Sequence, residues 1–280
     1  MHCHSTASDG ECAPVEVVQR AQAAGLAAIA LTDHDTTDGV ADAAREGARL
    51  GVRVIPGCEF SVRAPWGELH LLAFFLPPED ERLQAFLRDK RAARRRRGEQ
   101  IVAKLQALGI PIALEDVQAQ VGGGEGALGR PHVARALVDC GTAHDVADAF
   151  RQYLGRGRPA YVEKPLPALA EVTALVHTVG GITVAAHLGD HGTEGQIRQF
   201  QDQGLDGIEV RHPSHPPAVE QRLTRIAERL GLGISGGSDW HGDSEYGHTH
   251  APLGGMRVPA SWLEPLERRL SSTSPMRMRT

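Results

Sequence analysis

Short apolar runs alternate with helical segments towards both ends of this 280-residue chain. The runs cover residues 26–31, 52–55, 69–76, 182–186, 207–210 and 232–234. Strands that alternate with helices at this spacing form parallel βαβ units, and about seven such units close into a barrel. The pattern therefore predicts an α/β fold with a barrel-like parallel sheet.

The middle of the chain departs from this alternation. Between residues 80 and 165 helical patterns dominate, and the Gly-rich stretches GGGEGALG and LGRGRP separate them. We therefore expect a first barrel part over residues 1–79, a helical insertion domain over 80–165 and a second barrel part over 166–270. The polar tail SSTSPMRMRT, residues 271–280, is expected to be disordered.

The composition argues against several functional classes. A formal net charge of −5 gives no general attraction to nucleic acid or to a membrane surface, so any anion binding must be local. No apolar run is long enough to span a bilayer and no signal segment is visible, which predicts a cytoplasmic protein without a membrane partner. The four cysteines include no CxxC pair and are expected to be reduced. No obligate protein partner is indicated.

Histidine is unusually frequent, with 14 residues, and many of them stand beside carboxylates directly after an apolar run. The candidate metal ligands are His2, His4, Asp9, His34, Glu59, His70, His187, Asp239 and His241. In a parallel barrel the carboxyl ends of all strands share one face. Side chains that are far apart in the sequence are therefore expected to converge there.

Mixtures of imidazole and carboxylate suit divalent ions such as Zn²⁺, Fe²⁺ and Mn²⁺. Nine groups exceed what one ion uses, so they predict two or three ions bridged by a carboxylate, with Mn²⁺ favoured. Such a site activates water and neutralises phosphoryl oxygens, which predicts a phosphoester hydrolase without a protein nucleophile. A single His beside an Asp is more often an ordinary loop residue, so the prediction depends on the recurrence of the motif.

The segments that carry these residues closely resemble the PHP (polymerase and histidinol phosphatase) family. They are HCHSTASDGECAP, AIALTDHDTTDG, VIPGCEFS, GELHLLAFF, VAAHLG, GIEVRHPSH and GGSDWHG, in the family order, and they cover most of the chain outside the insertion. The resemblance implies a distorted (β/α)7 barrel with a trinuclear metal site. It also implies three ligand sets: His2, His4, Glu59 and Asp239; Glu59, His70 and His187; and Asp9, His34 and His241.

Three further residues are candidates for a catalytic role. By the same resemblance, Asp33 and Asp35 orient other ligands or the substrate. The acid that protonates the leaving group is left open between His215 and Asp35. Family members usually begin with an apolar strand and an Asp before HxH, whereas here Met1 directly precedes His2. We therefore expect the ion held by the HxH pair to be the least secure.

The motif GRPHVARAL resembles the branch of the family that includes nucleoside 3′,5′-bisphosphate phosphatases, whose members also act as 5′-to-3′ exoribonucleases on short RNA. This implies a phosphorylated nucleotide or a short RNA as the substrate. Arg130, His132 and Arg135 are the candidate substrate-binding residues, with the arginines on the phosphate that is not cleaved, because helix N-termini and guanidinium groups bind phosphate. Pro131 also simply suits a helix start, which explains part of the motif.

Two other functions remain open at this point: a histidinol phosphate phosphatase, which uses the same metal chemistry, and a non-catalytic nucleotide-binding module. The insertion with GRPH argues against the first, and the complete ligand set argues against the second. The segment from Arg88 to Gln100 has a local charge of +5 and is interpreted mainly as a solvated helix face rather than an RNA-binding surface. Trp66 and Trp240 are interpreted as packing residues in preference to base-stacking residues.

Overall fold

The structure, a computed structural model, describes residues 1–121, 128–243 and 251–273. It is an α/β fold built on one curled six-stranded sheet, in which the strands follow the order β1-β2-β3-β4-β5-β6. The strands are β1 Ala28–Leu31, β2 Arg53–Ala64, β3 Gly67–Phe74, β4 Ile182–Ala185, β5 Gly207–Arg211 and β6 Gly233–Gly236. The described sheet has one strand fewer than the seven-unit barrel that the resemblance implies.

Strand β3 runs antiparallel to both of its neighbours, whereas the other adjacent strands are parallel. The prediction of a parallel sheet was therefore wrong for β3. The reason is that β2 continues beyond its short apolar run to Ala64 and turns back through Pro65 and Trp66. A two-residue connection joins antiparallel strands only. Glu59 consequently lies within β2 and not after a strand, whereas His70 lies within β3, as its place inside the run 69–76 predicts.

The first residues of the chain lie between the two outer strands of the sheet. Cys3 forms parallel bridges to Leu31, at the end of β1, and to Trp240, shortly after β6. The Thr32 N–H donates to the Cys3 carbonyl, and the His4 N–H donates to the Trp240 carbonyl. Residues 2–4 therefore link the two edges at one end of the sheet.

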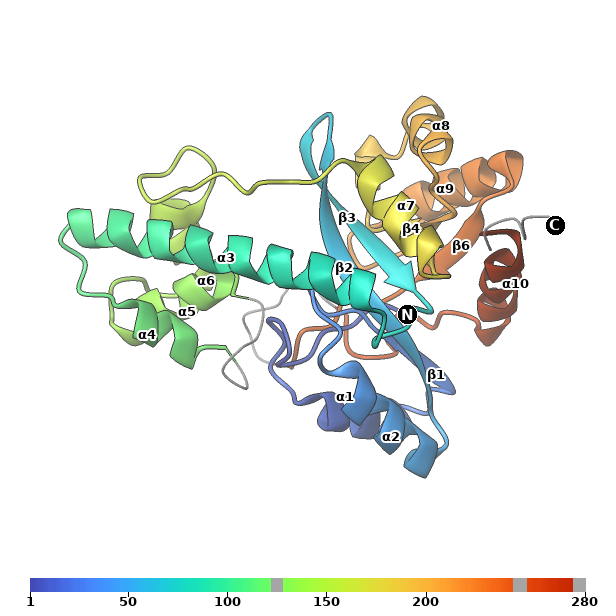
Figure 1. Ribbon diagram of the computed structural model, residues 1–280, viewed down its shortest axis with the longest axis horizontal. Coiled ribbons are helices and arrows are strands. Elements are labelled where there is room, and N and C mark those ends of the chain that lie inside the picture. Colours follow the sequence, from blue (N-terminus) through green and yellow to red (C-terminus); the bar gives the residue numbers. More distant parts are fainter. Residues whose placement is uncertain (122–127, 244–250, 274–280) are drawn as a thin grey trace.

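Helices surround the sheet (Figure 1). They are α1 Pro14–Ala23, α2 Val40–Leu50, α7 Leu169–Thr178, α8 Glu194–Asp202, α9 Pro217–Leu230 and α10 Leu263–Thr273, with 3₁₀ turns at Gly189–His191 and Ala260–Trp262. Helix α10 includes the first three residues of the predicted disordered tail, and residues 274–280 lie outside the described part. No helix in the described ranges combines the length and the apolar composition needed to cross a bilayer.

A separate group of helices extends to one side of the sheet (Figure 1). It consists of α3 Glu81–Ala107, α4 Leu114–Ala119, α5 Arg130–Asp139, α6 Val146–Ala149 and a π-helical turn, Phe150–Leu154. Asp80 starts α3, because its side chain accepts the backbone N–H groups of Arg82 and Leu83. The group has its own apolar core, from Ile101 to Ala160. This helical group occupies the region of the predicted insertion. That it forms a separate domain stays a prediction.

Candidate metal centre

Glu59 is at the centre of the predicted ligand cluster, and its side chain is buried in the middle of β2. Five imidazoles surround its two carboxylate oxygens. Oε2 is 3.1 Å from His4 Nε2, 3.2 Å from His34 Nδ1 and 3.4 Å from His2 Nε2, while Oε1 is 2.9 Å from His70 Nδ1 and 3.6 Å from His187 Nε2. The structure thus brings together side chains that are widely separated in the sequence.

The HxH pair belongs to the segment that links the sheet edges. Because Cys3 lies between them in an extended segment, His2 and His4 face the same side. Asp239 Oδ1 is 3.1 Å from Nε2 of each histidine. Gly237 is required beside them, because a Cβ atom there would lie 2.3 Å from Cβ of His2. Both side chains are buried, and backbone hydrogen bonds hold the segment on both flanks. That the ion at this pair is the least secure stays a prediction.

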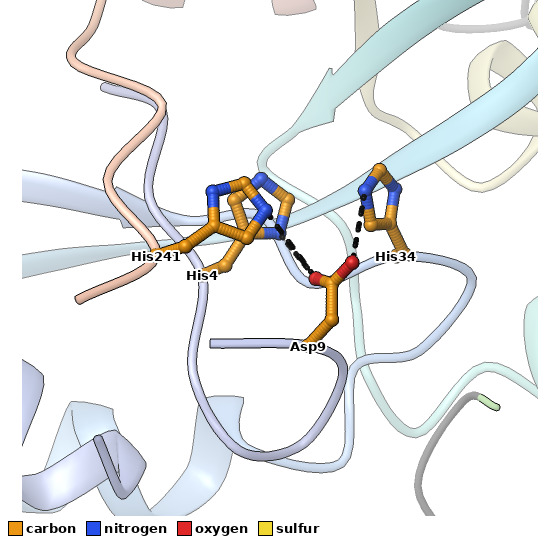
Figure 2. A group of neighbouring side chains, drawn as sticks. All are labelled: His4, Asp9, His34 and His241. Carbon is orange, nitrogen blue, oxygen red and sulfur yellow. Dashed lines mark ion pairs between the residues drawn. The ribbon is translucent and has the colours of Figure 1, made fainter. Parts of the chain in front are cut away.

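A neighbouring group consists of His4, Asp9, His34 and His241 (Figure 2), which offer ligand atoms within 4.8 Å of one another. Asp9 Oδ1 is 3.4 Å from Nε2 of His241, and Asp9 Oδ2 is 3.8 Å from Nε2 of His34. The rings of His4 and His241 stack with their centroids 4.0 Å apart. His4 and His34 each present their second ring nitrogen to Glu59, so they lie between the two groups.

The donor set fits divalent metal ions. Two further groups meet the same distance condition and share Glu59: one adds His2, His4 and Asp239, and the other adds His34 and His70. Within the described chain, buried nitrogen atoms of His2, His4 and His34 and both oxygens of Glu59 have no hydrogen-bond partner. Burying polar atoms without a partner is costly, and coordination of a cation removes that cost.

The charges in the cluster favour ionised carboxylates. Burial opposes the ionisation of Glu59, but the neighbouring histidines, His34 first, hold the pKa of this carboxyl well below its ordinary value. The pKa values of Asp9 and Asp239 are lowered in the same way. Burial lowers the pKa of His2, yet the surrounding carboxylates, Asp239 first, raise it to about 10. Metal ions compete with protons for such imidazoles, so metal binding is expected to release protons.

The backbone is strained where the site residues leave the strands. Asp35, His187 and Asp239 have φ angles of 52°, 29° and 51° without being glycine. Such conformations cost about 1–3 kcal/mol each and cluster at functional sites, where the surroundings hold them in place. The strain therefore marks the same end of the sheet as the ligand geometry does.

Glu209, within the apolar strand β5, was missed by the sequence analysis. Its buried carboxylate lies 3.2 Å from Nδ1 of His2 and accepts the backbone N–H of His187 at 3.0 Å. Nε2 of His2 faces Glu59 and Asp239 instead. A carboxylate behind a metal-binding histidine fixes the tautomer that presents the free nitrogen to the ion. The available signal was a lone charged residue in an otherwise apolar run.

Asp33, predicted to be catalytic, binds the loop that follows the HxH pair. Its carboxylate accepts hydrogen bonds from the N–H and hydroxyl of Ser5 and from the hydroxyl of Ser8, each at 2.7 Å. Both oxygens are engaged and the side chain is buried. This geometry suits the orientation of the loop that carries Asp9 rather than contact with a substrate.

Helix α5, which carries GRPHVARAL, contacts the same loop. Burial lowers the pKa of His132 to about 4, so the ring is neutral near pH 7. Its Nδ1 accepts the Gly129 N–H at 2.9 Å, and Nε2 donates to the Ser8 carbonyl at 3.0 Å. Arg135 donates from Nη2 to the Asp9 carbonyl at 2.6 Å. These contacts place both side chains against the loop that carries Asp9, and substrate binding by them stays a prediction.

Arg130, the third predicted substrate-binding residue, has different surroundings. Its guanidinium lies over the rings of Phe150 and Tyr161, at 5.5 and 5.9 Å from their centroids. It also lines a cavity together with Arg156 and Lys164. Arg130 is therefore placed where a substrate can contact it.

Asp35 forms a buried ion pair with Arg94 of α3, with 2.6 Å between Oδ2 and Nε. Burial opposes the ionisation of Asp35, but Arg94 lowers the pKa of this carboxyl below its ordinary value. An ionised carboxylate held in this way is a poor proton donor, so the geometry does not favour Asp35 as the leaving-group acid. Arg94 and Arg97 therefore do not belong to a solvated helix face. Arg94 pairs with Asp35, and Arg97 is buried and donates to the Val162 carbonyl.

His215, the other candidate acid, is buried with both ring nitrogens engaged. Its Nδ1 donates to the Val210 carbonyl at 2.9 Å, and its Nε2 accepts the Gly189 N–H at 3.1 Å. Burial also lowers the pKa of the ring. A neutral histidine with no free N–H has no proton to give, so these contacts do not favour His215 as the leaving-group acid.

Comparisons with known proteins identify several relatives of this chain. The family model of the PHP domain matches residues 1–108. The chain is 38% identical to a 3′,5′-nucleoside bisphosphate phosphatase of Chromobacterium violaceum, over 89% of this chain and 90% of that protein. It is 33% identical to a 5′-3′ exoribonuclease of Haemophilus influenzae, over 86% and 89% of the two chains.

A solved structure from Bifidobacterium adolescentis, assigned to the metal-dependent phosphoesterases, has the same fold. It superposes with a TM-score of 0.87 at 35% identity, over 98% of this chain and 95% of the other. The sequence relatives match most of this chain and most of their own length. The chain belongs to the PHP family.

Proposed function

We propose that this protein is a metal-dependent phosphoesterase that removes the 3′-phosphate from nucleoside 3′,5′-bisphosphates and degrades short 5′-phosphorylated RNA in the 5′-to-3′ direction. The single observation that carries the proposal is the buried carboxylate of Glu59 with five imidazoles around its two oxygens. The names of the two sequence relatives support the choice of substrate.

Two or three divalent ions would be held by nine side chains, with Mn²⁺ favoured and Zn²⁺ or Fe²⁺ as alternatives. One set is His2, His4, Glu59 and Asp239, the next is Glu59, His70 and His187, and the last is Asp9, His34 and His241. Bound there, the ions supply the Lewis acidity that activates a water nucleophile and neutralises the phosphoryl oxygens. We also infer that residues 2–4 act as the seventh strand of a distorted (β/α)7 barrel, since they bond to both edges of the sheet.

The other residues of the chain position this centre. Glu209 orients His2, and Asp33 holds the loop that leads to Asp9. Arg135 holds the backbone of the same loop from the helical group. Positioning of this kind accounts for much of a phosphoesterase's rate, because the attacking water and the phosphate must be aligned before reaction.

The test measures phosphate release from a nucleoside 3′,5′-bisphosphate and from histidinol phosphate, and nucleotide release from a short 5′-phosphorylated RNA. We expect turnover of the bisphosphate and the RNA with Mn²⁺, loss of turnover in chelator, and recovery when Mn²⁺ is restored. Preferential turnover of histidinol phosphate would contradict the proposed substrate. Full activity of metal-free protein would contradict the proposed chemistry.

A further inference from the structure

Two adjoining cavities lead away from the metal centre. The smaller, of about 190 Å³, is lined by the ligand candidates His70 and His187 together with Trp66 and Glu68. The larger, of about 860 Å³, is also lined by Trp66 and Glu68 and is named here the cationic cavity. Its other lining residues include Arg63, Arg130, Arg156, Tyr161 and Lys164. A volume of this size suits a ligand as large as a nucleotide.

A chain of polar contacts connects the cluster to the cationic cavity. Nδ1 of His70 faces Glu59 at 2.9 Å, and its Nε2 faces Glu68 Oε1 at 3.3 Å. The same Glu68 oxygen is 2.8 Å from Nζ of Lys164, which also donates to the Ser61 hydroxyl. Only the side chains of His70 and Glu68 therefore separate the centre of the metal cluster from the ammonium group of Lys164.

Two cations lie near the inner end of the cavity: Lys164 pairs with Glu68, and Arg94 pairs with Asp35. Lys164 and Arg94 together line a small void beside Asp35. The Arg94 side chain is 10% exposed, and its Nη2 atom has no hydrogen-bond partner in the described part of the chain. A buried guanidinium nitrogen without a partner costs free energy unless an anion binds it.

The outer part of the cavity offers charge and aromatic surface. Arg130 and Arg156 belong to its rim, and Tyr161 lies beneath the guanidinium of Arg130 at 5.9 Å. Trp66 stacks on His191 with 4.2 Å between ring centroids, which fixes the indole between the two cavities. Aromatic rings beside cationic side chains bind nucleotides by stacking and ion pairing, without selecting a particular base.

We propose that the cationic cavity binds the substrate phosphate that is not cleaved, together with its nucleoside, with Lys164 at the inner end and Arg130 and Arg156 at the rim. This proposal rests on the proposed function, because it assumes that the scissile phosphate lies at the metal cluster. In both proposed substrates the cavity would hold the same group, a 5′-phosphate with its nucleoside, and the following nucleotides of an RNA would continue from the scissile phosphate at the metal cluster.

The experiment compares two substrates that differ only in the second phosphate: a nucleoside 3′,5′-bisphosphate and the corresponding 3′-monophosphate. We expect the wild type to have a kcat/KM at least about tenfold higher for the bisphosphate, the value of one charge-assisted hydrogen bond. Arg130→Ala, Arg156→Ala and Lys164→Ala should reduce this ratio towards one while the 3′-monophosphate is still hydrolysed. Arg198→Ala, an exposed arginine on α8, should leave both rates unchanged.

A second measurement does not depend on turnover. Metal-free protein is titrated calorimetrically with a nucleoside 5′-monophosphate, and circular dichroism checks that each variant is folded. We expect binding to the wild type and to Arg198→Ala, and binding at least about tenfold weaker to Lys164→Ala and Arg130→Ala. Equal binding by all four proteins overturns the proposal, and so does a wild type that hydrolyses both substrates equally well. If the metal-loaded wild type releases phosphate from neither substrate, the proposed function is contradicted. The calorimetric titration still tests separately whether the cationic cavity binds a nucleotide.

Discussion

Glu209 and His2 form a buried pair in which the carboxylate Oε1 lies 3.2 Å from Nδ1, on the opposite side of the ring from Glu59 and Asp239. The pair joins β5 to the segment that links the sheet edges. Because Glu209 also accepts the backbone N–H of His187, one carboxylate orients two of the candidate ligands. Its position explains why a single acidic residue is kept inside an apolar strand.

Replacing Glu209 should therefore weaken metal binding without removing a ligand. Glu209→Gln can still fill the space, but its amide can hold His2 in the wrong tautomer. We expect Mn²⁺ affinity to fall by about 10- to 100-fold, the usual effect of losing a carboxylate behind a metal-binding histidine. Mn²⁺ titration followed by electron paramagnetic resonance measures this. Glu171→Gln, an exposed change on α7, is the matched control, and equal affinities of the two variants would show that Glu209 has no orienting role.

The contacts from α5 predict a link between the helical group and the metal cluster. His132→Ala leaves the Ser8 carbonyl without its donor, which should cost about 1–3 kcal/mol of stability and loosen the loop that carries Asp9. We expect a lower melting temperature and reduced metal content. His144→Ala, on an exposed side chain of the same helical group, serves as the control. A variant with normal stability and metal content but a raised KM would support direct substrate binding by His132.

A pH dependence follows from the surroundings of Lys164. The groups around it are Ser61 on β2, Glu68 on β3, Arg94 on α3 and Asp35 after β1. Burial, with Arg94 beside it, lowers the pKa of Lys164 to about 8. The side chain is cationic below that pH and loses its charge above it.

If Lys164 holds the second phosphate, the KM for a bisphosphate should rise as the pH increases from 7 to 9. Lys164→Arg keeps its charge over that range, so its KM should stay nearly constant. The corresponding 3′-monophosphate corrects for effects of pH on the metal cluster. The idea is refuted by a KM that rises equally in the wild type and in Lys164→Arg.

Most of the metal cluster could be predicted because its residues recur after apolar runs, and the sheet brings the ends of those runs together. The antiparallel direction of β3 could not be predicted, because it depends on β2 continuing through Glu59 to a turn at Pro65 and Trp66. Arg94 was hidden within a run of arginines. Arg94 lies seven residues from Leu87 and seven from Ile101, and both of these residues are buried on the same helix. This spacing could have distinguished Arg94 from the exposed arginines of the run.

The residues proposed to bind the substrate were harder to predict than the candidate metal ligands. A helix start with a histidine and arginines favours a phosphate site, and nothing in the sequence shows that His132 and Arg135 face the loop backbone instead. Lys164 lies in a segment without a motif, and its role depends on contacts with Ser61 and Glu68, about 100 residues earlier in the chain. Such long-range pairs are visible only in the folded structure.

The central claim is that Glu59 joins the ligand sets of a multinuclear metal site. The most direct test is the metal content per chain, measured by mass spectrometry after loading with Mn²⁺ and gel filtration, for the wild type, Glu59→Gln and the control Glu171→Gln. We expect two or three ions in the wild type and the control, and no more than one in Glu59→Gln, because two ligand sets lose their shared carboxylate and only the set of Asp9, His34 and His241 stays complete. Fewer than two ions in the wild type, or an unchanged content in Glu59→Gln, would contradict the claim.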